Sequence, residues 1–129
     1  MSGSNHSPAD SWSAPTARHA IDATLSIPGS KSLTNRELVL AALADGPSVI
    51  HGGLRARDTQ LMMQALVALG AQINPREGQP AEVWDVTPAS FRSISDAALV
   101  IDCGLAGTVM RFVPPMVLLG FQPVEFVGD

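Results

Sequence analysis

The sequence predicts a mixed α/β fold in which strands and helices alternate. Short apolar runs rich in Val and Ile alternate with longer segments whose apolar residues recur at helical spacing. Gly and Pro gather at the boundaries, where they favour turns. The expected order is β-α-β-α-β-β and then β-α-β. We therefore expect one complete βαβαββ unit and the start of a second.

The first half of the fold is expected to hold two strand–helix pairs. They are a strand from Ile21 to Ile27, a helix from Leu33 to Ala44, a short strand from Ser48 to His51 and a helix from Thr59 to Leu69. Asp45-Gly46-Pro47 is a typical stop signal for the first helix. In the second helix, Asp58 is placed to be the N-cap, and Met62 falls on the apolar face.

The second half is expected to begin with a two-strand ribbon. The predicted elements are strands from Gln72 to Asn74, Glu82 to Thr87 and Leu99 to Asp102, a helix from Val109 to Leu119 and a last strand from Val124 to Val127. Small residues from Cys103 to Thr108 predict a tight turn before the last helix. Pro114-Pro115 inside that helix predicts a kink or a delayed start.

The composition narrows the class of function. The chain has 129 residues, of which 46% are hydrophobic, and this supports one globular domain. Its net charge of −4 argues against a general nucleic-acid or membrane-surface binder, because such proteins are usually basic. No apolar run approaches the length of a membrane span, and the three histidines do not have metal-ligand spacing. Cys103 is expected to be a buried apolar residue, and a lone cysteine fits a reducing compartment.

Residues 1–20 are expected to form a disordered leader, and residues 21–129 the folded part. Residues 1–16 are rich in Ser, Ala and Pro. They also lack the apolar centre of a secretory signal.

The strongest functional signal is residues 28–36, which read Pro-Gly-Ser-Lys-Ser-Leu-Thr-Asn-Arg. They lie where a predicted strand gives way to a helix, and the N–H groups of a first helical turn bind anions. Ser32 and Arg36 are four residues apart and share a helix face, and Lys31 lies at the mouth of the turn. The alternative is that Ser30 or Ser32 is only an N-cap and the cations are solvated. The stretch lacks the glycines of a Walker-type loop.

Two other predicted helices begin with informative turns. In the turn from Gly104 to Arg111, Gly104 and Gly107 would let backbone N–H groups approach a ligand, and Thr108 could cap the helix or offer its hydroxyl. Plain turn geometry is the alternative for both glycines. In the turn from Arg55 to Thr59, the favoured interpretation is that Arg55 and Arg57 lie in a solvated loop. Asp58 is favoured as a simple helix cap over a catalytic role. Two glycine-and-cation helix starts make a shared anionic ligand more credible.

Residues 28–36 resemble the N-terminal signature of the 5-enolpyruvylshikimate-3-phosphate (EPSP) synthase family, P-G-S-K-S followed by two residues and N-R. Leu105 to Arg111 resembles that family's second signature, N-A-G-T followed by two residues and R. Arg57-Asp58-Thr59 falls where the family carries an acidic residue before its second helix. The resemblance extends from Ile21 to Asp129. It implies an enolpyruvate transferase-like fold of two domains, each made of three βαβαββ units, in which the earliest strand belongs with the second domain.

The resemblance also implies roles for individual residues. Lys31 would contact both substrates and assist proton transfer or charge stabilisation. Ser32 and Arg36 would bind shikimate 3-phosphate, Arg36 through the carboxylate, and Gly107 would offer its N–H to phosphoenolpyruvate. The other residues carried over are Asp58, grouped with Lys31 in catalysis, and Thr108 and Arg111 in substrate binding. Leu105 replaces the usual asparagine and is left out of the site.

The implied reaction transfers the enolpyruvyl group of phosphoenolpyruvate to the 5-hydroxyl of shikimate 3-phosphate and releases phosphate, in the pathway to aromatic amino acids. It needs no metal and no organic cofactor, and it implies a cytoplasmic enzyme that is monomeric at full length. The family chain is several times longer than 129 residues. We therefore expect a partial domain, without the second domain and inactive alone.

Four alternatives to this prediction remain. A UDP-N-acetylglucosamine enolpyruvyl transferase is disfavoured because its early motif resembles G-A-K-N, without counterparts of Ser32 and Arg36. An RNA 3′-phosphate cyclase is disfavoured by the acidic balance and by missing motifs. A non-catalytic anion-binding module is the third alternative, and a truncated chain with no function of its own is the fourth.

Overall fold

The computed structural model describes residues 12–91, 98–120 and 123–129. Its elements are α1 (Lys31–Leu43), β1 (Ser48–Ile50), α2 (Arg57–Ala68), β2 (Gln72–Pro75), β3 (Trp84–Thr87), β4 (Leu99–Asp102), α3 (Gly107–Val117) and β5 (Val124–Val127). The predicted mixed α/β class is confirmed. In the described ranges, no helix combines the length and apolar character that a membrane span requires.

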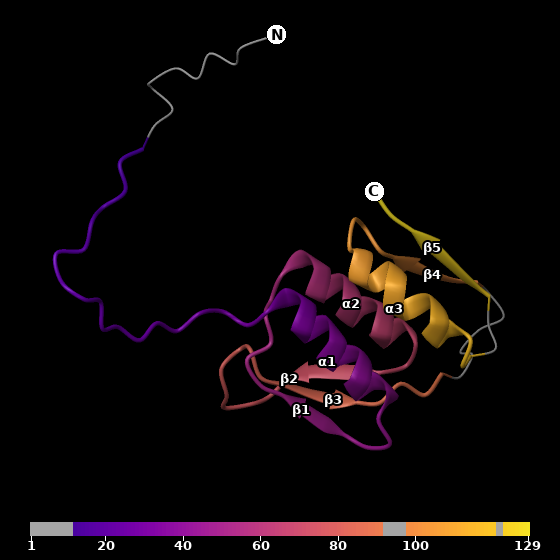
Figure 1. Cartoon of the computed structure of the whole chain (residues 1–129). Helices are drawn as coiled ribbons and strands as arrows, with labels where there is room; N and C mark the ends of the chain where they lie inside the picture. Colours follow the sequence, from indigo (N-terminus) through magenta and orange to yellow (C-terminus); the bar gives the residue numbers. More distant parts are fainter. Residues whose placement is uncertain (1–11, 92–97, 121–122) are drawn as a thin grey trace, which may run out of the picture.

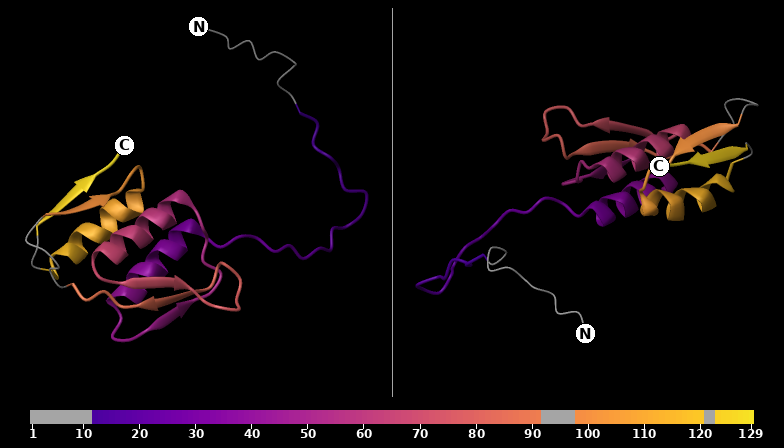
Figure 2. Two further views of the ribbon diagram at one scale, coloured as in Figure 1. Left: turned by 180° about the vertical axis from the view of Figure 1, so that it is seen from behind. Right: turned by 90° about the horizontal axis from the view of Figure 1, so that it is seen from above.

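The strands form two small sheets. The first is antiparallel, in the order β1-β3-β2, with Ile50 opposite Trp84 and Ile73 opposite Val86. The second pairs β4 with β5 in parallel, so β4, α3 and β5 form a crossover unit. The three helices lie next to one another (Figure 1), and seen from above both sheets lie on one side of them (Figure 2).

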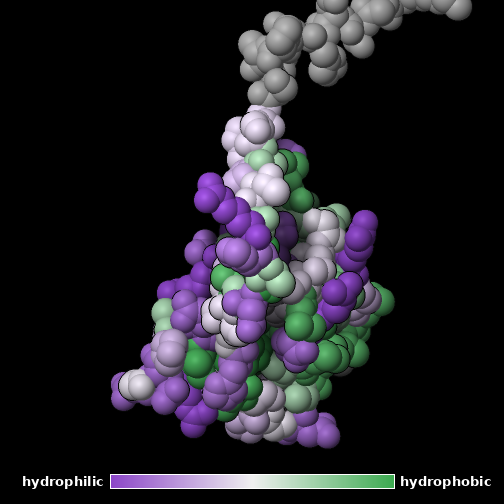
Figure 3. Space-filling view, turned by 60° about the vertical axis from the view of Figure 1, so that its left-hand side comes forward, coloured by the Kyte–Doolittle hydropathy of each residue, from purple (hydrophilic) through white to green (hydrophobic). Residues whose placement is uncertain are grey.

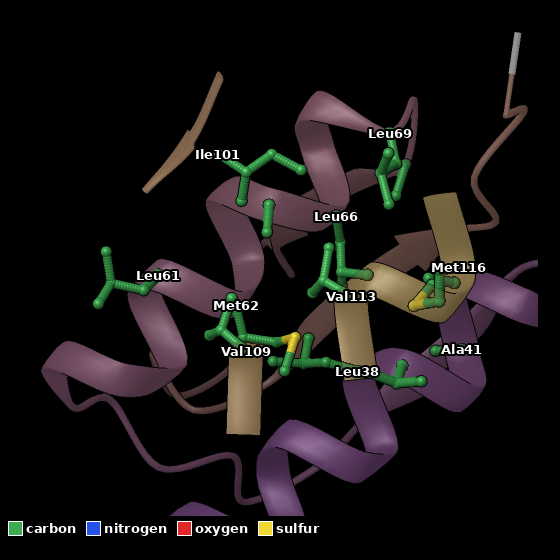
Figure 4. Close-up of a cluster of buried hydrophobic side chains, with 14 of the residues drawn as sticks. Leu38, Ala41, Leu61, Met62, Leu66, Leu69, Ile101, Val109, Val113 and Met116 are labelled. Carbon is green, nitrogen blue, oxygen red and sulfur yellow. The ribbon is translucent and has the colours of Figure 1, made fainter. Parts of the chain in front are cut away.

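The core lies between the helices and the sheets. Met62 and Leu66 of α2 are fully buried, and in Figure 4 they point toward Val109 and Val113 of α3. The expectation that Met62 belongs to the core is therefore confirmed. In the first sheet, the side chain of Trp84 at the start of β3 is almost completely buried.

The predicted strand from Ile21 to Ile27 does not form. The segment has no regular secondary structure, and Ile21, Leu25 and Ile27 are 80%, 82% and 84% exposed. A strand needs a neighbour to accept its backbone hydrogen bonds, and none of the described strands lies beside this segment. The expectation of a complete βαβαββ unit is therefore wrong at its first strand.

The leader stays a prediction. Residues 12–20 are exposed and lie outside any helix or strand, and residues 1–11 of the predicted leader lie outside the described residues. In Figure 1 residues 12–25 run away from the folded body.

Helix α3 begins earlier than the sequence predicts. It starts at Gly107 and continues through Pro114 and Pro115 to Val117, so the delayed start is wrong. Each proline removes one backbone hydrogen bond. The burial of Val113 and Met116 against the core offsets that loss and keeps the segment helical.

Candidate functional site

The first turns of the three helices lie at the same end of the helical layer (Figure 1). Side-chain contacts join them. The Lys31 ammonium lies 2.9 Å from the Asp58 carboxylate and joins α1 to α2. The Asn35 amide donates to the Thr108 hydroxyl over 2.6 Å and joins α1 to α3. The structure therefore brings the three turns singled out in the sequence into one cluster.

The start of α1 is fixed by its own side chains. Ser30 is the N-cap, and its hydroxyl accepts from the Leu33 N–H over 3.4 Å. The Thr34 hydroxyl donates to the Ser30 carbonyl over 2.9 Å and accepts from the Leu54 N–H over 3.0 Å. The turn that carries Lys31 is thus capped and also tied to the loop before α2.

Ser32 and Arg36 share a face of α1, as their spacing predicts. The Arg36 guanidinium donates to the Ser32 hydroxyl over 3.1 Å and to the Ser32 carbonyl over 3.4 Å. Arg36 is exposed and Ser32 is partly buried. The guanidinium is therefore held over the first turn while it stays open to solvent.

Asp58 does not cap α2, in contrast to the sequence prediction. The N-cap is Ala56, whose N–H donates over 2.8 Å to the hydroxyl of Thr59. Asp58 lies inside the first turn, where a carboxylate interacts favourably with the helix dipole. Its side chain is 27% exposed and that of Lys31 is 53% exposed, so Asp58 holds the cation at the surface.

Arg57 is the first residue of α2 and not part of a solvated loop, in contrast to the expectation. Its guanidinium forms an ion pair with Asp129, which follows β5. That hydrogen bond and the charge of Asp129 raise the pKa of Arg57. Arg55 is exposed, as expected.

The start of α3 leaves backbone open to a ligand. Gly107 is exposed, and a Cβ added to it would have no neighbour within 4 Å. Its N–H belongs to the first helical turn and has no partner within the helix. Thr108 is partly buried, and Arg111 is exposed one turn further on. Gly104 has a φ of +45°, which explains a glycine at that turn.

Two buried polar residues were missed as functional candidates in the sequence. Asn35 is 0% exposed and Thr34 is 4% exposed, and both make contacts between elements that lie far apart in the sequence. The signal was an asparagine in the interior of a helix, where it is a poor helix former. The cations beside it in the motif, Lys31 and Arg36, are the stronger signal for an anion site.

The predicted site residues lie on an open surface. A hollow of about 720 Å³ borders the motif at Gly29, but it extends toward residues 51–55 and 79–83 and does not include Lys31, Arg36 or Gly107. Figure 3 brings the left-hand side of Figure 1 forward, and hydrophilic residues cover much of this face. Such an arrangement of first-turn N–H groups, lysine and arginine can bind anionic groups from one side.

The comparisons with known proteins agree with each other. A sequence model of the family EPSP synthase (3-phosphoshikimate 1-carboxyvinyltransferase) matches residues 15–129. A 3-phosphoshikimate 1-carboxyvinyltransferase from Kocuria rhizophila is 47% identical over 131 positions, which cover 98% of this chain and 29% of that protein. Two structures of EPSP synthase from Acinetobacter baumannii match with a TM-score of 0.64 and 26% identity, over 81% of this chain and 23% of theirs. The chain thus spans less than a third of the length of these relatives.

Proposed function

Because this chain belongs to the EPSP synthase family, we propose that it forms one wall of an active site that uses phosphoenolpyruvate and shikimate 3-phosphate. The enzyme transfers the enolpyruvyl group to the 5-hydroxyl of shikimate 3-phosphate and releases phosphate. The observation that carries the proposal is the cluster of three helix starts, which presents Lys31, Arg36 and the Gly107 N–H at one end of the fold.

The chemistry of the substrates supports this assignment. Both are anions at neutral pH, and together they bring two phosphates and two carboxylates into one site. Their mutual repulsion must be offset by fixed positive groups, and preorganised donors are the most effective ones. Lys31, Arg36 and Arg111 supply positive charge here, and the first turns of α1 and α3 supply N–H donors.

The contacts of α1 support distinct roles for its residues. The Lys31 ammonium has three donors, and the Asp58 carboxylate occupies one side of it. The remaining N–H donors of the ammonium stay available to both substrates, so Lys31 can stabilise charge or move a proton. Ser32 and Arg36, joined by their hydrogen bond, bind shikimate 3-phosphate, with Arg36 on the carboxylate.

The start of α3 receives phosphoenolpyruvate in this proposal. The Gly107 N–H donates to the substrate, and the open space at its Cα lets the ligand approach closely. Thr108 and Arg111 complete this side of the site. Asp58 acts through Lys31 by fixing the position of its ammonium.

The reaction proceeds by addition and elimination. The 5-hydroxyl oxygen of shikimate 3-phosphate attacks the carbon that bears the phosphate in phosphoenolpyruvate, and a proton arrives on the methylene carbon. The resulting tetrahedral intermediate loses phosphate from the carbon that was attacked and a proton from the new methyl group. This restores the carbon–carbon double bond. In this proposal Lys31, whose ammonium is half-exposed at the start of α1, assists that proton transfer.

Residues beyond these 129 are part of the proposal. The chain covers only 29% of its 47% identical relative, so we propose that the 129 residues alone are inactive. Exposed apolar side chains on α1 and α3 support packing against further polypeptide; they include Leu33, Leu40 and Met110. The same proposal places a monomeric enzyme in the cytoplasm, since both substrates are charged metabolites that do not cross membranes unaided.

The test is a chimaera in which this chain replaces the matching 29% of the Kocuria rhizophila relative. We expect phosphate release that requires both phosphoenolpyruvate and shikimate 3-phosphate. Arg36→Ala should raise the KM for shikimate 3-phosphate by at least about tenfold, because a charge-assisted contact is lost. Arg76→Ala is the matched control, since Arg76 is an exposed arginine that directly follows β2 and is paired with Asp85 of β3.

Two results would contradict the proposal. One is a folded chimaera that releases no phosphate with these substrates. The other is turnover with UDP-N-acetylglucosamine in place of shikimate 3-phosphate, which would favour the sister transferase.

A further inference from the structure

Asn35 is buried in a way that its packing alone does not explain. Its side chain is 0% exposed and lies among the buried residues of α1. Its Oδ1 has no hydrogen-bond partner among the described residues. Burying an amide with an unpaired acceptor is costly, and an apolar residue of the same size would avoid that cost. A buried asparagine at this position therefore calls for a reason other than stability.

Among the described residues, the one hydrogen bond of the Asn35 side chain explains its position. Its Nδ2 donates to the Thr108 hydroxyl over 2.6 Å, from the second turn of α1 to the first turn of α3. Helix α3 has no side-chain cap of its own, because its N-cap residue is Ala106. Ser30, by contrast, caps α1. The start of α3 is thus held from outside, by Asn35.

We propose that Asn35 is a positioning residue that sets the Gly107 N–H and the Thr108 hydroxyl against the cations of α1. The inference deepens the proposed function and rests on it. Asn35 directly precedes Arg36 and lies one turn after Lys31, so it belongs to the same rigid helix as both. A shift of α3 relative to α1 changes the distance between the two proposed substrate positions.

The direction of the hydrogen bond adds a second consequence. When the Thr108 oxygen accepts from Asn35, the hydroxyl proton is free to point elsewhere. Gly107 and Thr108 are adjacent in the chain. An anionic oxygen bound at the Gly107 N–H therefore lies close to this hydroxyl and can accept a hydrogen bond from it. Asn35 thereby orients Thr108 as a donor toward phosphoenolpyruvate.

The test uses Asn35→Leu and Thr108→Val in the active chimaera. Both changes keep the number of heavy atoms in the side chain and remove the hydrogen bond, and Asn35→Leu also removes the unpaired acceptor. We expect each to raise the KM for phosphoenolpyruvate about tenfold, with the KM for shikimate 3-phosphate changed less than about threefold. The Asn35→Leu variant should be at least as stable to urea as the unsubstituted chimaera. Thr108→Ser keeps the hydroxyl and should raise the KM for phosphoenolpyruvate less than Thr108→Val does.

The double variant separates positioning from two independent effects. If Asn35 acts through Thr108, the double variant should have a phosphoenolpyruvate KM no higher than that of either single variant. Effects that multiply, or a phosphoenolpyruvate KM of Asn35→Leu within about twofold of the unsubstituted value, would overturn the inference while the proposed function stands. An inactive but folded unsubstituted chimaera would instead overturn the proposed function, and this inference with it.

Discussion

Lys31 and Asp58 form an ion pair of 2.9 Å that joins the first turn of α1 to the first turn of α2. The two residues come from separate motifs in the sequence. The pair keeps a half-exposed ammonium at the helix starts without burying its charge. This matters because an unfixed lysine samples many conformations, and fixing it in advance lowers the cost of binding.

Removing the Lys31 ammonium should nearly abolish activity. We expect Lys31→Ala to lower kcat of the chimaera by about a hundredfold or more, in line with the loss of a group that moves a proton or stabilises charge. Phosphate release at saturating substrate measures it. Near-normal turnover in this variant would contradict the catalytic role.

Removing only the Asp58 carboxylate should lower kcat less than removing the Lys31 ammonium. We expect Asp58→Asn to lower kcat by about tenfold, since the ammonium remains but loses its fixed position. The matched control is Asp85→Asn, which removes an exposed carboxylate paired with Arg76 at 3.7 Å on the first sheet. A larger loss for Asp58→Asn than for Lys31→Ala would show that the carboxylate acts directly.

A methyl group at Gly107 should weaken phosphoenolpyruvate binding without loss of stability. A Cβ there has no protein neighbour within 4 Å, so it would extend into the space proposed for the ligand. We expect Gly107→Ala to raise the KM for phosphoenolpyruvate about tenfold and to leave the free energy of unfolding unchanged or up to about 1 kcal/mol higher. Gly46→Ala is the control, because Gly46 also has open space around it and lies in the loop after α1. Equal KM values for the two variants would argue against a ligand at Gly107.

Cys103 should resist thiol reagents and contribute a pH dependence to stability. Burial, reinforced by the charge of Asp102, raises the pKa of its thiol. The folded state therefore retains its proton more firmly, and the free energy of unfolding should fall as the pH rises above about 8.5, the ordinary thiol pKa. Urea titrations of the 129-residue chain between neutral and alkaline pH measure this effect, and Cys103→Ala should remove it. Alkylation of the native chain as fast as of the urea-unfolded chain would contradict the burial.

The contact of α2 with the core should dominate stability. Leu66 is 0% exposed, whereas its neighbour Val67 is 49% exposed on the same helix. We expect Leu66→Ala to lower the free energy of unfolding by about 2–5 kcal/mol, and Val67→Ala by less than about 1 kcal/mol. Urea denaturation followed by circular dichroism checks both. Similar values for the two would contradict the described packing.

Much of the secondary structure could be predicted because it depends on local patterns. Helical spacing and the glycine after it located α2, and alternation located β3, whose buried residues are Trp84 and Val86. The boundaries of α3 were predicted less well. The intrinsic cost of Pro114 and Pro115 is local, but the burial that offsets it comes from other parts of the chain.

The sequence alone determined which groups this protein carries at its helix starts: Lys31, Ser32 and Arg36 on a capped first turn, and Gly107 on a second. Local spacing places those groups on a helix, and the motif they form indicated the family. Only the tertiary structure decided that the starts meet, through Lys31–Asp58 and Asn35–Thr108, because contacts between distant segments leave no periodic signal. It also decided that residues 21–27 form no strand, since a strand depends on hydrogen bonds to a neighbour that its own residues cannot supply.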